Sequence, residues 1–256
     1  MEIRNRVVVV TGGGGGIGGA LCRRFAAEGA ERVVVSDIDQ RAAERVAADI
    51  GGTAVRADVT VESDVARLVR ETVTAHGRID IYCSNAGIAF GGGPEASDQA
   101  WQESWCVHVM AHVYAARALL PGMQERGEGY IVGTISAAAL LNHILAAPYA
   151  VTKAAGLSFF EWMAIAYHDQ GIRVSALCPQ GVRTAMLTQE GARNFLTAGA
   201  LEPAQVADAV VEAIRDERFL ILPHPEVGEF FRRKAADYDR WLRGMRRLRA
   251  RILEER

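Results

Sequence analysis

The chain has 256 residues, of which half are hydrophobic, and its 29 basic and 31 acidic side chains leave a formal net charge of −2. These values describe a soluble globular protein long enough to bury one sizeable core. Four isolated cysteines, without any C-x-x-C pair, argue against a disulfide framework and against a zinc site: Cys22, Cys83, Cys106 and Cys178.

The beginning of the chain contains no recognisable targeting segment. Residues 7–10 are four valines, and this apolar run ends at once in Thr11-Gly12. Such a run is too short for a signal peptide or a membrane span. We therefore expect a cytoplasmic protein with reduced thiols.

Short β-branched runs alternate with helical patterns along most of the chain. In order, the patterns predict a strand at 6–11, a helix at 16–28, a strand at 32–36, a helix at 40–50, a strand at 53–57, a helix at 62–76, a strand at 79–84, a long helix at 97–120, and further strands at 129–135, 173–177 and 218–222. Nearly continuous apolar strands between amphipathic helices predict a doubly wound parallel sheet. The expected fold class is therefore α/β of the Rossmann type, with one catalytic domain over residues 1–225.

A glycine-rich loop joins the first strand to the first helix. It reads Thr11-Gly12-Gly13-Gly14-Gly15-Gly16-Ile17-Gly18. Glycines here allow a tight turn and let a pyrophosphate approach the positive end of the helix. Any flexible loop can be rich in glycine, but this position in a βα unit favours a dinucleotide site, with Gly12, Gly16, Ile17 and Gly18 as contacts.

The second predicted strand ends in Ser36-Asp37, with Ile38 directly after it, and Asp37 follows Gly18 by nineteen residues. A carboxylate at that distance can accept hydrogen bonds from the adenosine ribose and would repel a 2′-phosphate. We therefore expect NAD rather than NADP, although Arg23 and Arg41 could form a phosphate pocket. Asp37 could alternatively be the N-cap of the following helix, or serve in both roles.

Tyr149 and Lys153 lie four residues apart, and Ser136 precedes the tyrosine by thirteen residues. On a helix, side chains at i and i+4 share a face, so the lysine ammonium would favour the phenolate and make the tyrosine a usable acid or base. Lysine is rare here, since 27 of the 29 basic residues are arginine. The pair could occur by chance on any helix, and the surrounding motifs argue for chemistry.

The helix that carries Tyr149 continues through residue 167 and is apolar around most of its circumference. A helix that is hydrophobic around its whole circumference must be covered both by the core of its own chain and on the face that points away from that core. The second side is covered most simply by another copy of the chain, so we expect a homo-oligomer, a dimer or a homotetramer. Deep burial within one subunit is the alternative.

Together these motifs resemble the short-chain dehydrogenase/reductase family, over roughly residues 5–223. The matching pieces occur in the family's order: the glycine loop, Asp58-Val59, Asn85-Ala86-Gly87, Ser136, Tyr149, Lys153, and residues 179–184. The resemblance implies that Asp58 and Val59 hold the adenine ring. It also implies that Asn85, Ala86 and Gly87 line the cofactor and steady the sheet, and that Val182 and Thr184 hold the nicotinamide end.

The same resemblance implies the catalytic roles. Ser136 would position the substrate oxygen, and Tyr149 would be the general acid/base. Lys153 would hold the nicotinamide ribose and favour the ionised tyrosine. Hydride would then move between nicotinamide and a carbinol carbon while Tyr149 exchanges the hydroxyl proton.

His108 departs from the family pattern, because this position, seven residues after Trp101, is usually asparagine. In the family its backbone carbonyl holds a water that continues a proton relay from the lysine. The backbone role could survive the change, or the imidazole could relay protons itself. His108 and His112 also form an i, i+4 pair, but no third ligand stands at a telling spacing, so we expect no metal.

Three residues are candidate substrate contacts: His143, Gln180 and Met186. His143 follows Ser136 by seven residues and could instead be a solvent-facing loop residue. Gln180 stands where the family more often has glycine after proline. The resemblance implies that residues 186–200 close over the substrate. The apolar side chains nearby, without an obvious anion clamp, favour a hydrophobic secondary alcohol or its ketone.

Residues 226–256 lie beyond the family core. From residue 230 onward they contain ten basic and four acidic groups, with apolar residues at helical spacing. We expect a basic amphipathic helical tail that packs on a neighbouring subunit. A solvated appendage is the alternative, and contact with a membrane or with nucleic acid is not expected.

The sequence therefore predicts an NAD-dependent oxidoreductase acting on CH–OH groups of a small molecule. The alternative is a non-catalytic NAD-binding sensor or scaffold whose proton relay is altered at His108.

Overall fold

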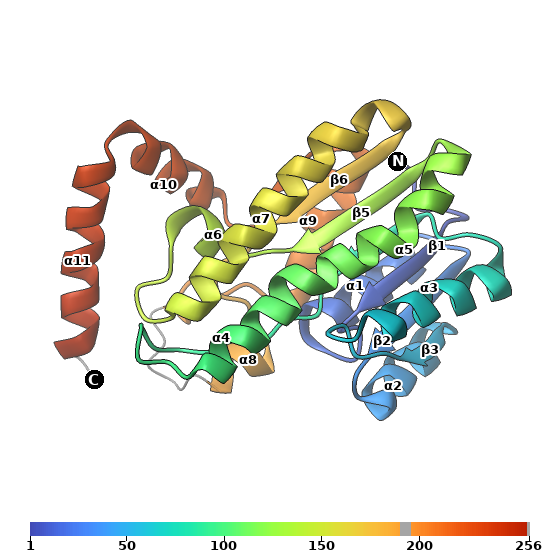
Figure 1. Cartoon of the computed structure of the whole chain (residues 1–256), viewed down its shortest axis with the longest axis horizontal. Coiled ribbons are helices and arrows are strands. Elements are labelled where there is room, and N and C mark those ends of the chain that lie inside the picture. The colour runs from blue at the N-terminus through green and yellow to red at the C-terminus, as the bar shows by residue number, and fades with distance from the viewer. Residues whose placement is uncertain (190–195, 255–256) are drawn as a thin grey trace.

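The computed structural model describes residues 1–189 and 196–254, and within them a parallel sheet forms the centre of the molecule (Figure 1). The strand order is β3-β2-β1-β4-β5-β6-β7, and every neighbouring pair is parallel. The doubly wound α/β prediction is confirmed. The strands are β1 Val7–Thr11, β2 Arg32–Asp37, β3 Thr53–Arg56, β4 Ile81–Ser84, β5 Gly129–Thr134, β6 Ile172–Leu177 and β7 Leu220–Ile221.

Helices cover both faces of the sheet, and each face has its own apolar core. One face is covered by α1 (Gly16–Ala27), α2 (Gln40–Ile50) and α9 (Pro203–Arg215). The other is covered by α3 (Glu62–His76), α5 (Ala111–Arg126) and α7 (Ala147–Tyr167). In the described ranges, no helix combines the length and the apolar character needed to cross a membrane.

The long helix predicted over 97–120 is interrupted by a different winding. It consists of α4 (Asp98–Trp105), a π-helical segment (Cys106–Met110) and α5, which runs on to Arg126. At the change of winding, the Ala111 N–H donates to the carbonyl of Cys106, five residues back. Single π turns are often found at functional sites, and this one contains His108.

The winding order of the sheet reverses between β1 and β4. The chain builds outward from β1 to β3 on one side and from β4 to β7 on the other. Ligands of such sheets bind where this reversal opens a crevice at the carboxyl ends of the strands. Here the Asn85 N–H donates to Thr11 Oγ1 at 3.0 Å, which joins the ends of the two strands.

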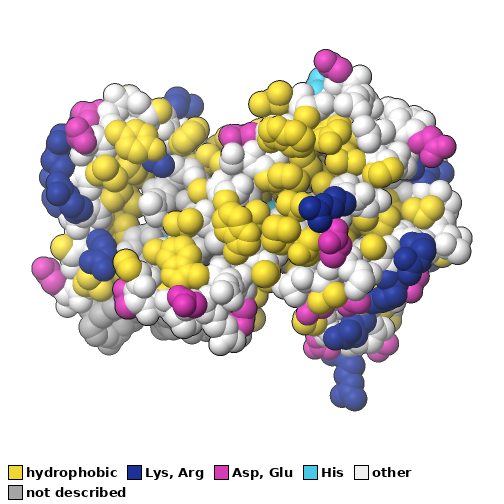
Figure 2. All heavy atoms as spheres, in the orientation of Figure 1, with side chains coloured by type: hydrophobic (Ala, Val, Ile, Leu, Met, Phe, Trp, Pro, Cys, Tyr) yellow, Lys and Arg dark blue, Asp and Glu magenta, His cyan; other side chains and the backbone are white. Residues whose placement is uncertain are grey.

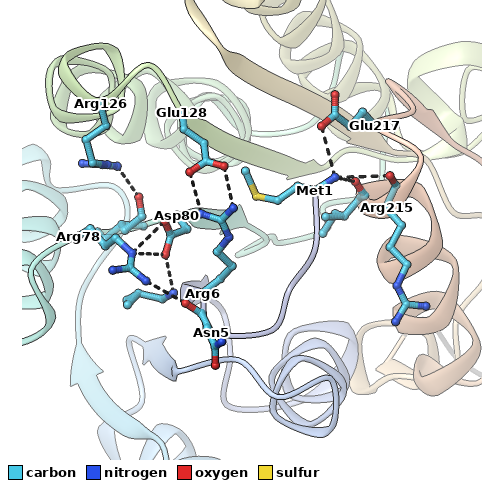
Figure 3. Close-up of polar contacts among 12 residues, drawn as sticks. Met1, Asn5, Arg6, Arg78, Asp80, Arg126, Glu128, Arg215 and Glu217 are labelled. Atoms are coloured by element: carbon cyan, nitrogen blue, oxygen red, sulfur yellow. Dashed lines mark hydrogen bonds and ion pairs between the residues drawn. The ribbon is translucent and has the colours of Figure 1, made fainter.

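The opposite, amino edge of the sheet is closed by ion pairs (Figure 3). Asp80 is 3 % exposed and accepts from the Val7 N–H at 2.8 Å and from Arg78 Nε at 2.9 Å. Arg6 forms two bonds of 2.7 Å with Glu128 and lies 3.4 Å from Asp80. The network joins β1, the start of β4 and the turn before β5, far from the carboxyl edge.

The basic tail forms two helices rather than the single helix predicted. These are α10 (Pro225–Ala236) and α11 (Tyr238–Glu254), called here the C-terminal arm. Asp237 between them has extended backbone and accepts from the Arg240 N–H at 2.9 Å, which starts the second helix. The arm packs on α6 (Ala137–Leu141) through α10, and α11 stands apart from the sheet in Figure 1.

Candidate active site

The glycine loop forms a cradle at the amino end of α1. Gly12 and Gly16 have φ of +61° and +52°, values that favour glycine. A Cβ at Gly18 would lie 2.0 Å from the Gly12 carbonyl, whereas one at Gly15 would meet nothing within 4 Å. The loop is therefore tightly folded yet open above Gly15, and the helix terminus there presents unpaired N–H groups to an anion. These residues fit the pyrophosphate of a dinucleotide.

Asp37 closes one end of this cradle. Its carboxylate accepts from the Gly14 N–H at 2.9 Å and from the Asp39 N–H at 3.0 Å. The prediction that Asp37 could cap the following helix is wrong, because Asp39 occupies the N-cap of α2. Arg23, a candidate for a phosphate pocket, is instead paired with Asp49 at 2.7 Å. Ile38 beside Asp37 is 58 % exposed and offers an apolar surface for a ring.

Asn85 ties together the strand ends around the crevice. Its side-chain NH₂ donates to the Thr11 carbonyl at 3.0 Å, and its Oδ1 accepts from Thr134 Oγ1 at 2.9 Å. A Cβ at Gly12 would lie 2.9 Å from Ala86 Cα, and one at Gly87 would lie 3.8 Å from Lys153 Nζ. The turn 85–87 therefore runs from the cofactor cradle to the lysine.

Asp58 and Val59 follow β3 at the same carboxyl edge. The Asp58 carboxylate accepts from the Thr60 N–H at 2.9 Å and from its hydroxyl at 2.7 Å. The Asp58 N–H donates to Asp64 at 3.0 Å. These bonds fix the turn that carries both predicted adenine contacts.

Lys153 lies on α7 one turn after Tyr149 and is 3 % exposed. Its Nζ donates to the Thr134 carbonyl at 2.8 Å and stands 5.8 Å from the centre of the Tyr149 ring. Burial lowers the pKa of this ammonium to about 7, and within the described residues no carboxylate pairs with it. The lysine can therefore change charge near neutral pH while it lies over the tyrosine ring.

Ser136 begins α6 at the end of β5. Its Oγ accepts from the Ala138 N–H at 3.1 Å, and the side chain is 8 % exposed. The neighbouring Cys178 is buried, and its thiol and the Lys153 ammonium influence each other's pKa. Burial raises the pKa of Cys178 to about 12, so it remains a neutral thiol.

His108 is fully buried beneath Tyr149, with the ring centres 5.4 Å apart and edge-on. The Ile88 N–H donates to its Nε2 at 3.3 Å, so Nε2 carries no proton. Its Nδ1 therefore donates to Thr152 Oγ1 at 2.8 Å, and that hydroxyl donates in turn to the Pro148 carbonyl at 2.7 Å. Burial, with Lys153 nearby, holds the pKa of His108 well below its usual range.

His112 lies one turn after His108, and the two imidazoles have different hydrogen-bond partners. Its Nδ1 is 2.7 Å from Ser84 Oγ, and its ring packs edge-on against Phe160. Burial lowers the pKa of His112 to about 3. The two histidines therefore serve separate hydrogen bonds in the core.

The three predicted substrate contacts lie around the site at different depths. His143 is partly buried, with its ring 6.2 Å from Tyr149, so the solvent-facing alternative is wrong. Gln180 is half-buried, and its N–H donates to His224 Nδ1 at 3.2 Å. Met186 is exposed on the short helix α8 (Ala185–Gln189). The central part of the predicted closing segment, residues 190–195, lies outside the described residues.

Val182 and Thr184 approach the cradle from the opposite side. Val182 is buried, and its carbonyl accepts from the Thr184 N–H at 2.7 Å. A Cβ at Gly16 would lie 3.1 Å from the Thr184 methyl group. Sequence reasoning missed Thr152 and His224, which orient His108 and Gln180; only their long-range partners reveal them.

A glycine cradle, the carboxylate of Asp37 against it, and a buried lysine beside a half-buried tyrosine at one crevice are typical of a nicotinamide-dependent oxidoreductase of the Rossmann type. The family model described as short chain dehydrogenase matches residues 6–194. The chain belongs to the short-chain dehydrogenase/reductase family.

Known relatives agree with this assignment. The chain is 35 % identical over 241 residues to 1-deoxy-11-beta-hydroxypentalenate dehydrogenase of Streptomyces exfoliatus, covering 88 % of this chain and 86 % of the relative. It is 34 % identical to meso-2,3-butanediol dehydrogenase of Serratia marcescens, covering 73 % and 75 %. A short-chain dehydrogenase/reductase of Burkholderia phymatum, solved with NAD, superposes with a TM-score of 0.84 at 28 % identity, covering 93 % and 96 %. The protein is thus an NAD(P)-dependent oxidoreductase acting on alcohols.

Proposed function

We propose that the protein interconverts a hydrophobic secondary alcohol and its ketone, with Tyr149 as general acid/base. The observation that carries this proposal is the buried Lys153, held at 2.8 Å by the Thr134 carbonyl beside the Tyr149 ring. An ammonium there stabilises the phenolate, and Ser136 at the same edge donates to the substrate oxygen. The bound nicotinamide supplies or accepts the hydride.

NAD is the proposed cofactor in preference to NADP. Asp37 supports this choice, because its carboxylate lies against the glycine loop, where a 2′-phosphate would meet a negative charge. The ion pair between Arg23 and Asp49 also occupies one of the two arginines that could bind such a phosphate. The Burkholderia phymatum relative was solved with NAD.

His108 is proposed to position the site rather than to carry protons. Its imidazole is neutral, and one tautomer is fixed by the Ile88 N–H and by Thr152. A ring that holds both of these bonds cannot accept and release a proton without breaking one of them. The backbone carbonyl of His108, which lies in the π turn, remains available to hold the water of the family's proton relay.

A homo-oligomer is proposed from the exposed side of α7. Four apolar side chains along this helix face outward: Val151 (51 % exposed), Ala154, Trp162 (57 %) and Ile165 (83 %). Figure 2 shows hydrophobic side chains gathered over α5 and α7. A contiguous apolar patch of this kind marks an interaction surface, and a second copy of α7 is its simplest partner.

The test is turnover by matched tyrosine variants. Secondary alcohols are incubated with NAD or NADP, and the absorbance of the reduced nicotinamide is followed. We expect turnover with NAD, loss of most turnover in Tyr149→Phe, and no loss in Tyr167→Phe, which removes a hydroxyl at the other end of α7. Near-normal rates in Tyr149→Phe would contradict the proposed mechanism. Binding of NAD without turnover of any alcohol or ketone would favour the sensor or scaffold alternative.

A further inference from the structure

The C-terminal arm borders the loop that leads to Tyr149. Lys234 of α10 donates to the Leu140 carbonyl at 2.6 Å, and Arg249 of α11 donates to the Ile144 carbonyl at 3.1 Å. The arm therefore holds residues 140–144 at both ends. His143, in the middle of this loop, presents its ring to Tyr149.

A groove of about 540 Å³ lies between this loop and α11. Asn142 and Ile144 line the groove, while His143 between them faces Tyr149. This single loop therefore separates the groove from the Tyr149 ring. Trp241 and Met245 give the groove an apolar wall.

The charge in the groove is strongly positive. Lys234, Arg243, Arg246 and Arg249 line it, against one carboxylate, Asp239. Neither Arg243 nor Arg246 forms an ion pair with any residue in the described part of the chain. Basic side chains also gather along the arm in Figure 2. Guanidinium groups beside an apolar wall favour carboxylate or phosphate, with which they form paired charge-assisted bonds.

We propose that the groove binds the anionic end of an elongated substrate, a carboxylate or a phosphate, while the apolar body of that substrate extends to Tyr149. This inference rests on the proposed oxidoreductase function and adds the chemical class of the substrate. The apolar pocket expected from the sequence is then the middle of the binding path rather than its whole extent.

The kinetic test compares two double variants of the same helix. Arg243→Gln/Arg246→Gln removes two charges from the groove, and Arg240→Gln/Arg247→Gln removes two charges from α11 outside it. Each is assayed with NADH on 7-oxooctanoate and its methyl ester, and on acetoacetyl-coenzyme A and acetoacetyl-N-acetylcysteamine. The first pair differs only in a free carboxylate, and the second differs in the nucleotide end of coenzyme A, which carries the phosphates.

We expect the groove variant to raise KM at least about tenfold for the anionic member of one pair, with kcat nearly unchanged, and to leave the neutral member unaffected. The control variant should stay within about twofold of the parent. High salt should reduce the difference. Equal effects on anionic and neutral members, or equal effects of the two variants, would overturn the inference.

A binding measurement separates this inference from the proposed function. Trp241 lies in the groove, so its fluorescence reports occupancy, and Trp241→Phe identifies its share of the signal. Titration with 7-oxooctanoate and with coenzyme A should give a saturable change with at least one of them in the parent and the control variant, and the groove variant should need at least about tenfold more of that anion for the same change. No saturable change in the parent with either anion would overturn the subsite, even if the enzyme oxidises alcohols. Saturable binding without any turnover would leave the subsite standing and contradict the oxidoreductase proposal.

Discussion

Asp80 and Lys153 are both buried charged side chains, at opposite edges of the same sheet, and their surroundings differ in kind. Asp80 at the amino edge is bound by Arg78, by Arg6 and by a backbone N–H. Lys153 at the carboxyl edge donates to a backbone carbonyl and lies over the ring of Tyr149. Hydrogen bonding to Asp80 raises the pKa of Arg78, whereas burial lowers that of Lys153 to about 7.

The contrast shows how one sheet separates stability from chemistry. A charge that is paired on several sides fastens the segments it joins. A buried charge without a countercharge is costly, and the cost makes its protonation easy to change. The following predictions test this separation, in order of decreasing effect.

Replacing Lys153 by methionine should affect rate and stability in opposite directions. We expect kcat to fall by about 10²–10⁴-fold, because Tyr149 loses the ammonium that favours its phenolate. The free energy of unfolding at pH 7 should rise by on the order of 1–4 kcal/mol, because a buried, unpaired ammonium is removed. Steady-state kinetics and urea unfolding measure the two effects. A variant that is both slow and less stable would show that Lys153 supports the fold.

Asp80→Ala should show the converse behaviour. The free energy of unfolding is expected to fall by about 3–5 kcal/mol, because Arg78 and Arg6 lose a buried partner. The rate per folded molecule should not change, because the network lies at the edge away from the site. Asp216→Ala, which breaks an exposed ion pair with Arg218, is the matched control and should cost at most about 1 kcal/mol. A large change in kcat for Asp80→Ala would contradict the separation of the two edges.

Binding of NADH should be coupled to proton uptake at Lys153. The pKa of Lys153 in the free protein is about 7, and the negative charge of the dinucleotide would raise it. A raised pKa favours binding below pH 7 and weakens it as pH rises through the bound-state value, by at most about tenfold per unit. Calorimetry at pH 8 in buffers of different ionisation enthalpy measures the uptake. The same uptake in Lys153→Met would assign the proton to another group.

His108→Asn should have the smallest effect. The neutral imidazole holds its neighbours without titrating, so the pH at half-maximal kcat is expected to stay constant while kcat changes less than about tenfold. His168→Asn, on an exposed surface, is the control. Loss of one limb of the pH profile in His108→Asn alone would show that the imidazole carries protons after all.

Local sequence pattern was sufficient to predict the fold and to place the cofactor site at the carboxyl edge of the sheet. Buried parallel strands require continuous apolar runs, and the glycine loop requires residues that tolerate positive φ and close backbone approach. The tyrosine and the lysine share a helix face because they stand four residues apart. Each of these properties depends on neighbours within a few residues, so the sequence displays them directly.

Other properties depended on residues distant in the chain. The tautomer of His108 is set by Ile88 and Thr152, twenty and forty-four residues away. Asp39 rather than Asp37 caps α2, because the Asp37 carboxylate accepts a hydrogen bond from Gly14, twenty-three residues earlier.

The C-terminal arm was visible in the sequence as a basic amphipathic segment of unknown position. Its contacts with Leu140 and Ile144 span about a hundred residues and bring its arginines to the loop beside Tyr149. The sequence by itself thus determined the fold, the cofactor class and the tyrosine-lysine pair. Only the tertiary structure decided which charges are paired and which face the site, because pairing depends on where distant segments meet.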